Sequence, residues 1–154
     1  GRARDYMNVA RDEHVLAAPE TNSSNKWAGG GFRSTPQDLA RFGIALLDGQ
    51  VVSAEARELM FTPRKLKNGK TNLQDYGLGF RVDTIRDPAY PGKSWRAVHH
   101  GGVAVGSQAM LVLLPKERVV VALTANATTQ PPGRGMFDAA TDLALMFAEA
   151  GDNP

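Results

Sequence analysis

Two apolar segments joined by a short polar connection constrain the fold of this chain more than any other feature. Residues 108–114 and 119–124 are rich in Leu and Val, and the polar residues 115–118 separate them. Apolar runs of this length are typical of buried strands, and so short a connection fits antiparallel neighbours. The two segments therefore predict an antiparallel hairpin with a buried face.

Helical signals lie on both sides of this hairpin. Thr35 is suited to cap a helix over residues 36–48, because Pro36 fits its first turn and Asp38 completes a pattern like a capping box. Ser53 predicts a second, short helix over 54–60, and residues 137–150 predict a final one. The expected fold class is α+β, an antiparallel sheet with flanking helices.

The other segments carry weaker signals. Residues 1–26 suggest a hairpin or extended coil, residues 76–82 a strand, and residues 87–93 a loop with two prolines. Another strand is expected to begin at Ala97. We therefore expect most of the sheet to come from the second half of the chain.

Composition limits the classes of protein that the chain can represent. At 154 residues with 42% hydrophobic residues, it is long enough for one domain and too short to argue for two. The net charge of +2 is spread along the sequence, so neither a nucleic-acid nor a membrane partner is expected. Cysteine is absent, which excludes disulfides and thiol nucleophiles, and we expect no cofactor.

The most informative candidate for a site is the run His99-His100-Gly101-Gly102, which continues to Gly106. Adjacent histidines suggest a metal, but on a strand they point to opposite faces and cannot both bind one ion. We therefore expect no metal site. The glycines leave room for an incoming ligand, which suggests the lining of a cleft instead.

Within that run, His100-Gly101-Gly102 can be interpreted in two ways. As a site, the imidazole borders an open strand edge, and the amide of Val103 can donate to a developing oxyanion. As structure, it is a histidine satisfied in the core beside a glycine bulge. The tripeptide alone favours the structural interpretation.

Two further strings match motifs of serine hydrolases. Ser23-Ser24-Asn25-Lys26 fits S-x-x-K, in which a helix places the nucleophile beside its base, but the following Trp and glycines prevent a helix from continuing. Tyr6-Met7-Asn8 fits Y-x-N, but it precedes Ser23, the reverse of the usual order. A chance match and a surface strand are the simpler interpretations of these strings.

A longer resemblance favours the interpretation of His100-Gly101-Gly102 as part of a site. Residues 26–43 read KWAGGGFRSTPQDLARFG, and YGLGF at 76–80, H-x-G-x-x-x-G at 100–106 and the apolar hairpin follow in order. This series resembles the C-terminal part of penicillin-binding-protein-like serine hydrolases, in particular the class C and mitochondrial beta-lactamase-like branch. The resemblance is strong from Lys26 to Asn126 and weak before it.

The resemblance implies roles for four residues. In that family S-x-x-K, Y-x-N and K-T-G or H-x-G meet in one cleft, and only the third motif matches here in both string and context. By resemblance, His100 would hydrogen-bond the tyrosine or the substrate carboxylate, Gly101 and Gly102 would admit the substrate, and the Val103 amide would form half of the oxyanion hole. His99-His100-Gly101 is a second possible register.

The missing motifs suggest that residues 1–154 are a C-terminal fragment of a single hydrolase domain. By resemblance, the parent protein would act through an acyl-enzyme on a small molecule or peptide with a hydrolysable carbonyl. Beta-lactams, D-alanyl peptides, short acyl esters and mitochondrial-type peptides are all candidates, with an esterase or peptidase modestly favoured. The partner of this chain would be the missing N-terminal part of the domain, and the chain alone would be inactive.

Two other functions stay open. The chain could be a non-catalytic binding or structural module of the same fold, or it could catalyse by itself through Ser23, Lys26 and His100. Its compartment is also open: an exported or periplasmic bacterial location is compatible with the resemblance, and a signal peptide would lie upstream of Gly1. For the hydrolase, we expect His100 to face an open groove.

Overall fold

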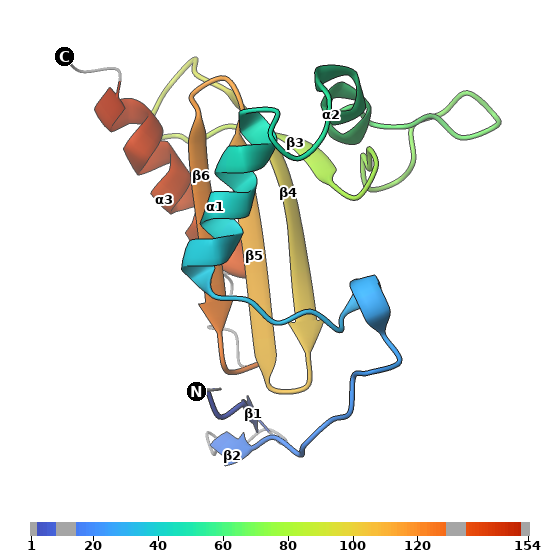
Figure 1. Cartoon of the computed structure of the whole chain (residues 1–154). Helices are drawn as coiled ribbons and strands as arrows, with labels where there is room; N and C mark the ends of the chain where they lie inside the picture. Colours follow the sequence, from blue (N-terminus) through green and yellow to red (C-terminus); the bar gives the residue numbers. More distant parts are fainter. Residues whose placement is uncertain (1–2, 9–14, 129–134, 152–154) are drawn as a thin grey trace.

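The computed structural model of the chain describes residues 3–8, 15–128 and 135–151 (Figure 1). The strands are β1 (Tyr6–Asn8), β2 (Val15–Ala17), β3 (Arg81–Ile85), β4 (Trp95–Ala104), β5 (Ser107–Leu114) and β6 (Val119–Ala125). The helices are η1 (Trp27–Gly29), α1 (Pro36–Leu47), α2 (Ala54–Phe61) and α3 (Met136–Gly151). The expected helices and the 108–124 hairpin are confirmed, with shifts of one or two residues at their ends.

Four strands form the central sheet, antiparallel throughout and in the order β3-β4-β5-β6. The strands β4 and β5 meet at the pair Ala104↔Ser107, and β5 and β6 at Leu114↔Val119. The short strands β1 and β2 form a separate two-stranded sheet. The α+β class with an antiparallel sheet is therefore confirmed.

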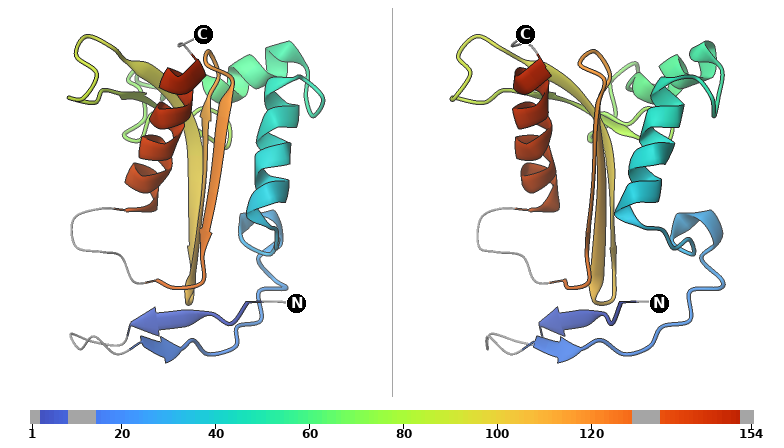
Figure 2. Two further views of the ribbon diagram at one scale, coloured as in Figure 1. Left: turned by 90° about the vertical axis from the view of Figure 1, so that its left-hand side faces the viewer. Right: turned by 60° about the vertical axis from the view of Figure 1, so that its left-hand side comes forward.

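The sheet lies between helices on both of its faces. Figure 2 shows the strands nearly edge-on, with α3 on one side and α1 on the other. Because side chains alternate along a strand, each strand supplies both faces. Val112 and Leu114 of β5 pack with α3, whereas Leu111 and Leu113 pack with Leu46 of α1. The core is thus two apolar layers separated by the sheet.

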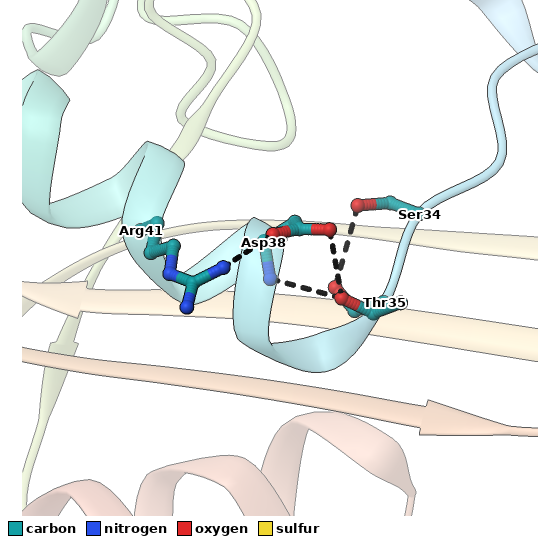
Figure 3. A network of polar contacts seen from close by, with 4 residues as sticks. All are labelled: Ser34, Thr35, Asp38 and Arg41. Carbon is teal, nitrogen blue, oxygen red and sulfur yellow. Dashed lines mark hydrogen bonds and ion pairs between the residues drawn. The ribbon is translucent and has the colours of Figure 1, made fainter.

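Helix α1 begins at the cap that the sequence predicts (Figure 3). The Asp38 amide donates to Thr35 Oγ1 over 3.1 Å, and the Thr35 hydroxyl donates to the Asp38 carboxylate over 3.0 Å. The carboxylate also accepts from Arg41 at 2.9 Å, and the Ser34 hydroxyl donates to the Thr35 carbonyl. These contacts fix the point at which the glycine-rich segment becomes helix.

The expected strand over residues 76–82 is wrong for residues 76–80, and only Arg81 and Val82 lie in a strand, β3. The segment folds back on itself, because the Gly77 amide donates to the Phe80 carbonyl over 2.8 Å and Tyr76 forms an isolated bridge with Arg81. A Cβ atom on Gly77 would lie 2.0 Å from the Met60 carbonyl oxygen at the end of α2. Only glycine allows so close an approach, so the segment is a packed turn that leads into β3.

The N-terminal strands lie against the turn between β4 and β5, as Figure 1 and Figure 2 both show. The Tyr6 amide donates to the carbonyls of Gly106 and Asn126, at 3.3 and 2.8 Å. Gly106 has a φ of +76°, and a Cβ atom there would lie 2.5 Å from the Ala18 side chain. The N-terminal segment thus holds this end of the sheet. Among the described residues, no helix is long and apolar enough to cross a membrane.

Candidate functional site at the open end of β4

The two adjacent histidines lie on opposite faces of the sheet, as the strand geometry predicts. His99 is 4% exposed and faces α3, where its ring lies 4.1 Å from the ring of Phe137, centroid to centroid. His100 is exposed and lies near Tyr76 instead. The two imidazoles therefore have unrelated environments, and a single ion cannot bridge them.

His99 is a structural residue of the α3 face. Its Nε2 lies 2.6 Å from the Asp83 carboxylate on β3, while its buried Nδ1 has no hydrogen-bond partner among the described residues. Burial lowers the pKa of His99, and the nearby Asp83 only partly opposes this shift. We therefore expect a neutral imidazole that donates Nε2–H to Asp83.

His100 contacts a tyrosine, although not the one that the family resemblance suggests. The Tyr76 hydroxyl oxygen lies 3.2 Å from His100 Nε2, and the two rings are 5.8 Å apart, centroid to centroid. The two residues are 24 positions apart in the sequence, and the fold of the 76–80 turn beside β4 brings them together. His100 Nδ1 makes no hydrogen bond within the described part of the chain.

Tyr76 is itself held firmly in place. The Asn72 side-chain oxygen accepts from the Tyr76 amide over 2.8 Å, and the Asn72 amide group donates to the Tyr76 carbonyl over 2.9 Å. The same carbonyl accepts from the Arg64 amide over 2.7 Å. The guanidinium of Arg81 lies 5.3 Å above the Tyr76 ring. Backbone, ring and hydroxyl of this tyrosine are thus all engaged.

Beyond His99, strand β4 has an open edge, which pairs with no other strand among the described residues. The pairing with β3 ends at Arg81↔His99, whereas the pairing with β5 continues to Ala104. In an antiparallel pair, the amides of successive residues point alternately toward the partner strand and away from it. Among residues 100–104, alternate amides therefore point toward the open edge and are available to a ligand.

A groove of about 960 Å³ extends from the end of β4 across the neighbouring ends of β5 and β6. Gly102 and Val103 line it from β4, and the glycine-rich residues 29–31 and Ser23 line it from the N-terminal side. Val103 is 75% exposed. His100 and Gly101 do not line the groove, and His100 contacts Tyr76 instead. The four sequence-predicted residues are thus consecutive along β4, with Gly102 and Val103 on the groove.

The two glycines of the motif differ in what surrounds them. A Cβ atom on Gly102 would meet nothing within 4 Å, and Gly102 has no left-handed backbone angle. A Cβ atom on Gly101 would lie 2.6 Å from the end of the Met110 side chain. Packing therefore does not require glycine at 102, where a side chain would instead occupy the approach to the groove.

Neither of the other two candidate motifs forms a catalytic pair. Ser23 lies on the groove, but its hydroxyl and the Lys26 ammonium make no hydrogen bond with each other in the described residues. Directly after Lys26 the chain forms only the three-residue helix η1 before the glycines end it, as the sequence predicts. Tyr6 lies in β1, where its backbone is part of the N-terminal contact with the sheet.

Sequence reasoning missed Tyr76 and Asn72 as parts of the site. The YGLGF string marks the right segment, but its alternation of large residues is typical of a strand. Asn72 carries no motif at all. Within the described residues, no group of three or more His, Asp or Glu side chains is placed to bind a metal ion.

Comparison with known proteins identifies the family. The family model described as Beta-lactamase matches residues 1–145. The human serine beta-lactamase-like protein LACTB, mitochondrial, is 32% identical over 137 residues, which cover 75% of this chain and 24% of that protein. The bovine protein of the same name is 30% identical over 154 residues, covering 88% of this chain and 26% of the relative.

The chain thus spans about a quarter of the length of these relatives. Their names place them in mitochondria, so the comparisons do not support an exported or periplasmic bacterial location. The family match covers the sheet, the open edge of β4 and most of α3. The chain belongs to the serine beta-lactamase-related family.

Proposed function

We propose that this chain supplies one wall of the active site of a serine hydrolase that acts through an acyl-enzyme. The nucleophilic serine and its base would lie outside residues 1–154. The observation that carries the proposal is the open edge of β4, where exposed His100, unobstructed Gly102 and the Val103 amide follow one another. Family membership supports the hydrolase class, and the match covers only about a quarter of the length of the relatives.

The chemistry follows from the groups at this edge. A backbone amide that points away from β5 can donate to the oxygen of a carbonyl under attack, where negative charge develops. Gly102 leaves room for the substrate chain to lie along the strand. His100 can hydrogen-bond a polar group of the substrate at the far end of the edge. The substrate would be an ester or peptide that approaches as an extended strand.

Covalent labelling tests this proposal. The complete product of the gene that encodes these residues should react with a fluorescent fluorophosphonate, and peptide mapping should locate the label on a serine outside residues 1–154. The isolated chain should remain unlabelled. A label on Ser23 that is lost in Ser23→Ala would contradict the proposal and support self-contained catalysis.

Two variants connect the activity to the edge of β4. We expect His100→Ala and Gly102→Val to lower kcat/KM for an ester substrate by about 100-fold, the size typical of a lost contact to the reacting atoms. Tyr90→Phe is the matched control, because Tyr90 packs on Trp95 far along the sheet. Unchanged rates in both variants would refute the site.

The experiment also distinguishes a binding module from an enzyme. A gene product that lacks S-x-x-K and Y-x-N outside these residues, and that takes up no label, would contradict the hydrolase. The groove and the open edge of β4 would then be assigned to the binding of a peptide or partner chain.

A further inference from the structure

The contact between Tyr76 and His100 has a chemical consequence for the imidazole. A neutral histidine carries its proton on one ring nitrogen and offers a lone pair on the other. Which nitrogen carries the proton is set by the hydrogen bond that the other one makes. The only hydrogen bond of the His100 imidazole within the described residues joins Nε2 to the Tyr76 hydroxyl.

The phenol is the better donor of the two groups. A phenol oxygen shares its lone pairs with the ring and is a weak acceptor, whereas an imidazole nitrogen without a proton is a strong one. The Arg81 guanidinium above the Tyr76 ring withdraws electron density, which further favours the hydroxyl as donor. The O–H of Tyr76 therefore donates to Nε2, and the proton of the imidazole stays on Nδ1.

We propose that Tyr76 is a positioning residue that fixes neutral His100 in the Nδ1–H tautomer. The Asn72 side chain holds Tyr76 in place through hydrogen bonds with its backbone amide and carbonyl. With Nε2 occupied, His100 presents a hydrogen-bond donor and not a general base. A ligand at this end of the open edge is expected to offer an acceptor oxygen, such as a carboxylate or a carbonyl.

The neighbouring histidine has the opposite arrangement. A carboxylate only accepts hydrogen bonds, so Asp83 requires the proton of His99 on Nε2. The buried Nδ1 of His99 then carries a lone pair and no unpaired N–H. Two consecutive residues on one strand are therefore expected to be different tautomers, and His99 serves as an internal reference for His100.

Nuclear magnetic resonance can test this without any activity. The chain is labelled with ¹⁵N-histidine, and two-bond ¹H–¹⁵N correlations are recorded at about pH 8.5, where a free imidazole is neutral. We expect a protonated Nδ1 at His100 and a protonated Nε2 at His99. His100→Gln and His14→Gln variants assign the signals.

Tyr76→Phe is the decisive variant, because it removes one oxygen and keeps the ring. The ratio of Nδ1–H to Nε2–H at His100 should then invert in favour of Nε2–H, while the His99 signals keep their shifts and report an intact sheet. Tyr90→Phe, the matched control, should change neither histidine. Asn72→Ala should give a ratio between those of the wild type and Tyr76→Phe.

Two results would overturn the inference. One is a wild-type His100 that carries its proton on Nε2, and the other is a Tyr76→Phe variant with the wild-type ratio. The inference deepens the proposed function, because it concerns the same edge of β4. The two can fail separately: the tautomer is measured in the isolated chain, whereas the hydrolase is tested by labelling of the complete gene product.

Discussion

Among the described glycines, Gly77 is the one whose replacement by alanine should lower the stability of the fold most. In Gly77→Ala the new Cβ atom would lie 2.0 Å from the Met60 carbonyl oxygen and 3.0 Å from the Thr62 carbonyl oxygen. The first distance is about 1.4 Å short of the separation at which ordinary contact begins. Both neighbours are backbone, so neither can rotate away as a side chain could.

The magnitude follows from two costs. Overpacking of this kind lowers stability by about 1–3 kcal/mol. The separation of the turn from α2 would also break the 3.2 Å bond from the Leu78 amide to the Met60 carbonyl, which costs about 1 kcal/mol. We therefore expect the free energy of unfolding of Gly77→Ala to be lower than that of the wild type by about 2–4 kcal/mol.

Urea unfolding followed by circular dichroism measures this difference. The midpoint should fall while the slope of the transition stays constant, because the surface exposed on unfolding is nearly the same. Gly102→Ala is the matched control, since its Cβ atom meets nothing within 4 Å. Its free energy of unfolding should equal that of the wild type or exceed it by up to about 1 kcal/mol. A Gly77→Ala variant within about 0.5 kcal/mol of the wild type would refute the account of this turn.

Three other predictions test the core, the cap and the buried histidine. Leu46→Ala removes a fully buried side chain from the α1 layer, so it should lower the free energy of unfolding by about 2–5 kcal/mol in the same urea assay. Thr35→Ala should lower the free energy of unfolding by about 1 kcal/mol, because the cap of α1 is lost. Ser34→Ala should change this free energy by less than about 0.5 kcal/mol, and equal effects of the two substitutions would contradict the capping role. Burial lowers the pKa of His99, so the unfolded chain takes up a proton at higher pH than the folded chain. The free energy of unfolding should therefore fall as the pH drops below about 6.5. His99→Gln should flatten this dependence between about pH 8 and 5, and an equally steep dependence in that variant would assign it to another group.

Local signals explain which parts of the fold could be predicted from the sequence. The start of α1 depends on Thr35, Pro36 and Asp38, which act within one turn of chain, so the pattern and the observed contacts agree. The hairpin of β5 and β6 depends on apolar runs and a short connection. The opposite faces of His99 and His100 follow from strand alternation alone.

Contacts between distant segments explain what could not be predicted. The large residues at 76, 78 and 80 alternate as in a strand, but Gly77 packs against the end of α2 and turns the chain instead. Asn72 has no sequence signature, because its role consists of bonds to the backbone of Tyr76. The meeting of Tyr76 with His100 depends on the register of β4 and could be known only from the fold.

The two-residue turn between β4 and β5 determines which imidazole can meet a ligand. Ala104 pairs with Ser107, and the N-terminal strands hold this turn through Gly106. A slip of one residue moves every side chain of a strand to the other face of its sheet. A single inserted residue that β4 absorbed in this way would place His100 against α3 and turn His99 outward. The length of this turn therefore determines which histidine lies at the candidate site, although neither turn residue is one of the groups proposed to act there.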